Sequence, residues 1–150
     1  MKSIKLMSVL LTSTLALAAC QKAEAAPVDV TLGYANNNVI NESGLRADIG
    51  TEVNNVRFGL STFSADDRLV SYGAYGQLPI NIHESKFTVT PQVRVEQYRE
   101  ESELVGSLGI GLEYQLADTV RVDAVALRSR GSDNDNIDGE SYMFGVTKSF

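Results

Sequence analysis

Apolar and polar residues alternate along the chain with a period of two from residue 28 onward. This period places every second side chain of an extended strand on the same face. The alternating segments are residues 28–35, 44–52, 56–63, 69–78, 87–98, 106–116, 119–128 and 141–150. The pattern therefore predicts eight β-strands of about ten residues each.

The connections between these segments alternate between shorter turns and longer, more acidic loops. The shorter set is 53–55, 79–86 and 117–118, and the longer set is 36–43, 64–68, 99–105 and 129–140. Consecutive strands joined in this way pair as antiparallel neighbours, and eight of them can close an up-and-down barrel. Pro91 interrupts the fifth segment, because proline has no N–H to donate to a ladder. We expect a bulge at Pro91, or a strand that begins near Gln92.

The alternation is compatible with two barrels that differ in which face points inward. A soluble lipocalin-like barrel has its apolar face inside, whereas a transmembrane barrel turns that face toward lipid. The polar face carries these charged residues: Asp29, Arg46, Asp48, Glu52, Arg57, Arg94, Glu96, Glu113, Arg121 and Asp123. Eight strands leave an interior that side chains fill, and arginines bind carboxylates bidentately in such places. We expect these charges to interlock in the lumen of an all-β, eight-stranded, antiparallel transmembrane barrel.

Residues 1–19 have the pattern of a bacterial export signal. Lys2 and Lys5 lie near the start of the chain, an apolar run follows, and small residues come after it. Leu17-Ala18-Ala19-Cys20 matches the lipobox of lipoproteins, which predicts lipidation of Cys20. Residues 20–27 would then tether a barrel domain of residues 28–150. The alternative is ordinary cleavage after Ala25, which would remove Cys20 with the signal.

The last segment carries a more specific signal. The sequence stops on an aromatic residue, and apolar residues precede it on the same face: Tyr142, Phe144, Val146 and Phe150. This resembles the C-terminal signature of bacterial outer-membrane barrels that the barrel-assembly machinery recognises. The layout of residues 28–150 is similar to the small eight-stranded family that includes the OmpA transmembrane domain and the OmpX/Ail proteins. The resemblance implies a monomer in the Gram-negative outer membrane, with lipid and lipopolysaccharide as partners. It carries over no functional residue.

Composition removes other classes of function. Cleavage before Cys20 removes two of the 13 basic residues and none of the 19 acids, so the mature chain carries a net charge of −8. Nucleic-acid binding needs clustered Lys and Arg, so we exclude it. The single His, His83, lies in the 79–86 turn beside Glu84 and Ser85, which is not a positioned triad. We therefore expect no enzyme, no cofactor and no metal centre.

Residues 133–140 (DNDNIDGE) superficially resemble a calcium loop. The spacing fails, because Ile137 stands where a ligand is needed and the glycine comes one position late. A weak divalent-ion site that bridges to lipopolysaccharide phosphates stays open.

Three functions remain compatible with the sequence. The first is a structural or surface-interaction protein of the outer membrane with a lumen filled by side chains. The second is a narrow pore, which inward-pointing charges in eight strands disfavour. The third is a soluble periplasmic binding barrel. They differ first in which face of the sheet points outward.

Overall fold

The computed structural model describes residues 26–100, 102–132 and 138–150. The signal sequence, Cys20 and most of the tether lie outside these residues. The strands are β1 (Val28–Asn37), β2 (Glu42–Val53), β3 (Val56–Ala65), β4 (Arg68–Gln77), β5 (Ile80–Asn81), β6 (Phe87–Tyr98), β7 (Glu103–Ala117), β8 (Val120–Gly131) and β9 (Asp138–Ser149). No helix in the described part of the chain is long and apolar enough to cross a membrane.

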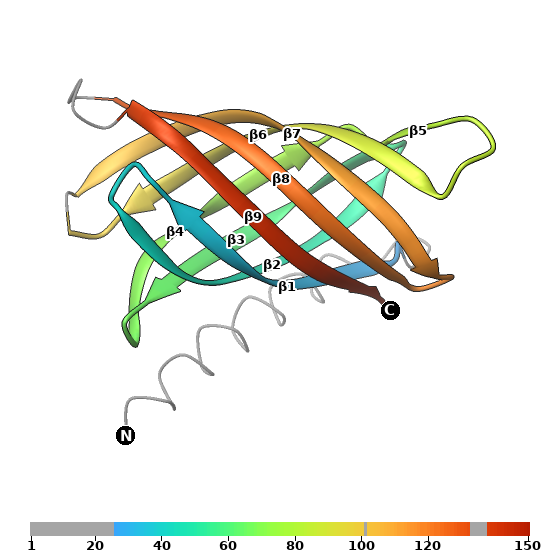
Figure 1. Cartoon of the computed structure of the whole chain (residues 1–150), viewed down its shortest axis with the longest axis horizontal. Coiled ribbons are helices and arrows are strands. Elements are labelled where there is room, and N and C mark those ends of the chain that lie inside the picture. Colours follow the sequence, from blue (N-terminus) through green and yellow to red (C-terminus); the bar gives the residue numbers. More distant parts are fainter. Residues whose placement is uncertain (1–25, 101, 133–137) are drawn as a thin grey trace.

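The strands form a closed antiparallel barrel (Figure 1). Neighbours in sequence pair in order, β1 pairs with β9, and β4 pairs with β6, so the sheet returns on itself as an eight-stranded barrel. The two-residue strand β5 continues β4 beyond the rim and pairs with β6. The prediction of an eight-stranded antiparallel barrel is confirmed.

The register fixes the tilt of the strands. Partners followed once around the barrel from Val28 return to β1 at Asn38, a displacement of ten residues. With normal strand spacings, this stagger over eight strands corresponds to a tilt of about 40°. The barrel is therefore narrow, and side chains must fill its interior.

The two ends of the barrel differ. We call the end where β1 begins and β9 ends the base, and the opposite end the mouth; in Figure 1 they lie on the right and the left. Two-residue turns occur at both ends. Asn54 and Asn55 at the base and Asp66 and Asp67 at the mouth have positive φ values, as tight hairpin turns require. The strands at the mouth are longer than the pattern predicts, because the expected loop 64–68 shrinks to this Asp-Asp turn.

The expected irregularity at Pro91 is wrong, because β6 runs unbroken through it. Pro91 accepts a bond from the N–H of Leu78 at 3.0 Å. The return bond, which proline cannot donate, is missing where β4 ends and Pro79 follows. The ladders instead shift between β3 and β4, where Val70 is the extra residue, and near Leu116. The bulge turns Val70 into the lumen, although its place in the alternation predicted the outer face.

Candidate functional site

Five charged side chains meet inside the barrel near its base. We call them the base cluster: Asp29, Glu52, Arg57, Glu113 and Arg121. Arg57 Nη1 lies 2.5 Å from Glu113, and its other nitrogens lie 3.3 Å from Glu52 and 3.4 Å from Asp29. Arg121 lies 2.6 Å from Asp29 and 3.4 Å from Glu113. The two guanidinium groups thus share Asp29 and Glu113 between strands β1, β3, β7 and β8.

A second group of charges lies farther from the base. This mid-lumen cluster consists of Arg46, Asp48, Arg94 and Glu96, all of them buried. Asp48 is its centre, because Arg46 Nε lies 2.8 Å and Arg94 Nη2 3.2 Å from its carboxylate. Arg46 also lies 3.9 Å from Glu96, and the Arg94 guanidinium stacks on the Tyr75 ring at 5.0 Å. Buried charges are tolerated when they are paired in this way.

Asp123 takes part less directly than the other predicted lumen residues. The alternation put Asp123 two residues from Arg121 and Glu96 two residues from Arg94, on one face of a strand. The arginines turn instead to acids on other strands, Arg121 to Asp29 and Arg94 to Asp48. Among the described residues no donor reaches Oδ1 of Asp123. Partners are chosen across the lumen rather than along a strand.

An apolar plug fills the lumen toward the mouth, which the sequence did not lead us to predict. Its buried members are Ala35, Phe63, Ala65, Val70, Val125, Leu127 and Met143. Arg46 donates to the sulfur of Met143, so the plug is in contact with the mid-lumen cluster. The signal was present in the sequence, since Phe63, Val125 and Leu127 are apolar residues on the predicted polar face.

The turn between β1 and β2 closes the mouth above this plug. Val39 and Ile40 pack against buried Tyr98 and Val105, and Ile40 also packs against the plug. Asn37 holds the turn in place, because its side chain donates to the Tyr98 hydroxyl at 2.6 Å and accepts from the Val39 N–H at 3.1 Å. The loop is thus a cap on the lumen.

The outer wall of the barrel is apolar. Its exposed large apolar residues include Leu32, Leu45, Phe58, Leu60, Val93, Val95, Leu108, Ile110, Leu112, Phe144 and Val146. Three tyrosines, Tyr34, Tyr72 and Tyr142, stand on the outside toward the mouth, and Phe87, Tyr114 and Phe150 stand toward the base. A band of aliphatic side chains between aromatic girdles is the surface of a barrel that faces lipid. Soluble monomers rarely expose so large an apolar surface.

Comparison with known proteins finds similarity of structure only. No family model and no curated protein matches the sequence. A de novo designed transmembrane β-barrel has a TM-score of 0.64 at 9% identity, covering 85% of this chain and 98% of its own. Outer membrane protein Ail of Yersinia pestis has 0.57 at 16%, covering 84% and 100%. Neisserial surface protein A has 0.56 at 15%, covering 83% and 96%. The chain has the fold of a small transmembrane β-barrel.

This fold decides which face points outward. The charged face lies inside and the apolar face outside, so the arrangement of a lipocalin-like barrel, with its apolar face inside, is wrong for this chain. The C-terminal residues Tyr142, Phe144, Val146 and Phe150 all belong to the exposed apolar wall. The backbone of Phe150 exchanges both hydrogen bonds with Val28, at 3.0 and 3.2 Å, and so helps to join the first and last strands.

The remaining candidate residues lie at the two ends of this transmembrane barrel. His83 is fully exposed in the turn at the base, 3.8 Å from Glu84, and the Ser85 hydroxyl donates to the Ile82 carbonyl. These side chains are therefore not assembled around a common substrate position. Residues 133–137 of the calcium-like segment lie outside the described residues. Among the residues described, no three His, Cys, Asp or Glu side chains gather as metal ligands would.

Proposed function

We propose that this protein is an outer-membrane barrel with a closed lumen, and that it acts as a structural or surface-interaction protein. One observation carries the proposal: the chain buries charged residues inside a barrel whose outer wall is exposed and apolar. In water this inversion would be unfavourable, because burying charges costs free energy and exposing apolar surface forfeits its burial. In a bilayer the same wall is solvated by acyl chains.

The filling of the lumen supports a protein that does not conduct ions. The base cluster, the mid-lumen cluster, the plug and the Val39–Ile40 cap follow one another along the barrel axis. An ion that crossed would have to break the paired charges and displace packed apolar side chains. The narrow pore is the alternative function, and a conductance measurement distinguishes it.

The partners follow from the location. We infer contact with outer-membrane lipid and lipopolysaccharide along the wall, and recognition of the C-terminal segment by the barrel-assembly machinery. The base lies on the periplasmic side and the mouth outside in this proposal. The acidic chain is not suited to nucleic acid. We propose a monomer without enzymatic activity, since the charged side chains of the lumen are engaged with one another.

Two measurements test the proposal. Expressed in a Gram-negative host, the full chain should be found in the outer-membrane fraction and should migrate faster on a gel when unheated than when boiled. Refolded protein in a planar bilayer should give no steady single-channel conductance. Recovery in the aqueous periplasmic fraction would overturn the membrane location, and stable unitary currents would favour the pore.

A further inference from the structure

Strand β8 differs from its neighbours on the outer wall. From base to mouth its outward side chains are Val120, Val122, Ala124, Ala126, Arg128 and Arg130. Strands β7 and β9 on either side present Leu, Ile, Tyr and Phe at the same heights. The short alanine side chains therefore leave β8 recessed between two taller rows.

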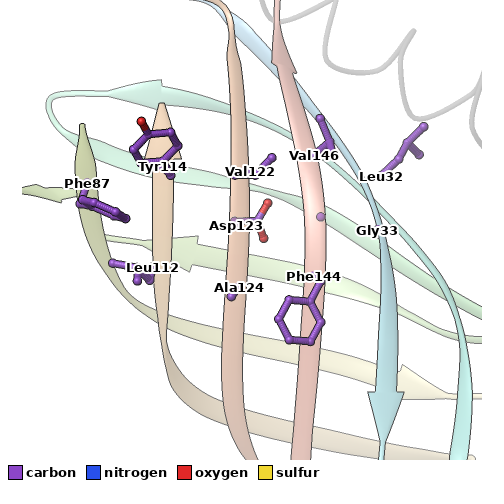
Figure 2. A pocket seen from close by; sticks show the side chains of 11 residues that line it. Leu32, Gly33, Phe87, Leu112, Tyr114, Val122, Asp123, Ala124, Phe144 and Val146 are labelled. Carbon is purple, nitrogen blue, oxygen red and sulfur yellow. The ribbon is translucent and has the colours of Figure 1, made fainter. Parts of the chain in front are cut away.

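The recess is a continuous groove. One hollow has a volume of about 500 Å³ and runs from Phe87 and Val122 to Ala124 (Figure 2). A second, of about 320 Å³, continues over Ala126 toward Tyr142. The two share Leu112, Ala124 and Phe144, and Figure 2 shows Ala124 as the short side chain between the other two. Strands one place apart on either side set a width of about 10 Å, which suits acyl chains.

Two arginines stand at the mouth end of the groove. Arg128 is the next outward residue after Ala126, and its side chain is 70% exposed. It contacts Asp138 through Nη2 alone, at 3.2 Å. Exposed ion pairs of this kind contribute little and exchange readily. The Tyr142 ring lies opposite Ala126 in the ladder, so Arg128 stands just above the row of tyrosines, at the depth of lipid headgroups.

We propose that the β8 groove binds one membrane lipid with an anionic phosphate headgroup. Its acyl chain lies over Ala124 and Ala126, and its phosphate contacts Arg128 and Arg130. Arginine suits this role, because its planar guanidinium donates two parallel bonds to phosphate oxygens. The inference rests on the proposed location in a membrane. The positive charge at one end of an apolar groove favours a lipid over a second copy of this chain.

The chain has no tryptophan, so a single introduced Trp reports on the groove. Phe144→Trp puts the reporter in the groove, and Tyr72→Trp on β4 is the matched reporter outside it. Each variant is refolded into phosphatidylcholine vesicles that contain a minor fraction of brominated lipid, either phosphatidylglycerol or phosphatidylcholine. The ratio of the two quenching strengths gives the preference for an anionic headgroup at each reporter and is insensitive to its depth.

The groove reporter should prefer brominated phosphatidylglycerol about fivefold, the value expected for one arginine at a membrane surface, and more if both arginines contribute. The preference should fall toward one in Arg128→Gln and in the double variant with Arg130→Gln. It should persist in Arg99→Gln, which removes a charge from the mouth away from β8. The Tyr72→Trp reporter should show a ratio near one.

The outcomes separate this inference from the proposed function. Equal quenching by both lipids at the groove, or a preference that survives the Arg128 and Arg130 substitutions, overturns the lipid site and leaves the membrane wall in place. Quenching at Tyr72→Trp, with no quenching by either lipid at Phe144→Trp, would mean that a second copy covers the groove. Absence of quenching at both reporters would overturn the membrane location itself.

Discussion

Removing Arg57 from the base cluster should destabilise the barrel more than any other single charge change at the base. Its side chain is 7% exposed and lies within 3.4 Å of three carboxylates, those of Asp29, Glu52 and Glu113. Arg57→Met keeps most of the side-chain volume and removes the charge. Arg121 alone would then face Asp29 and Glu113, and one buried carboxylate would be left without a cation.

Breaking a buried pair by removing one partner costs about 3–5 kcal/mol. With a urea slope of about 1–3 kcal/mol per molar, that cost lowers the unfolding midpoint by roughly 1–3 M. The midpoint is measured in detergent by the loss of β-sheet circular dichroism, with gel mobility of unheated samples as a second probe.

The matched control is Arg128→Met, because Arg128 pairs with Asp138 on the exposed surface. An exposed pair is worth about 0–1 kcal/mol, so its midpoint should stay close to wild type. Adding Glu113→Gln to Arg57→Met removes the stranded charge and should recover part of the loss. Equal midpoints for Arg57→Met and Arg128→Met would refute the idea that the base cluster is held by paired charges away from water.

Three further predictions concern other parts of the chain. A palmitate analogue should label the wild type and not Cys20→Ala; an unlabelled wild-type chain beginning at Ala26 would show ordinary cleavage. Phe150→Ala should lower the outer-membrane yield and leave unassembled protein in the periplasm, whereas a normal yield would contradict a role in assembly. Gly50→Ala should cost about 1–3 kcal/mol by overpacking, because a methyl there meets the Tyr75 hydroxyl inside the lumen. Gly76→Ala, which meets only ordinary contacts, is its control, and equal urea midpoints would refute the packing argument.

The strands and their faces follow from the sequence because both depend on local pattern. A period of two is visible wherever one face contacts lipid and the other contacts polar side chains. The exception, Val70, marks the limit of this logic. A bulge adds one residue to β4, so both Val70 and Ser71 become buried, and no local signal announces the change of phase. Pro91 misled in the opposite sense, since its missing bond coincides with the end of β4.

The pairing inside the lumen was not predictable in the same way, because it depends on the stagger of the whole barrel. Arg94 and Asp48 are 46 positions apart in sequence, and Arg121 and Asp29 are 92 apart. They come together because a displacement of ten residues around eight strands brings distant positions to the same height in a narrow interior. A single sequence shows that four arginines and their acids point inward, and only the closed register decides which of them share a carboxylate. The consequence is that the lumen acts as one unit. A substitution at Arg57 changes the surroundings of Arg121, although their strands are not neighbours, because both contact Asp29 and Glu113.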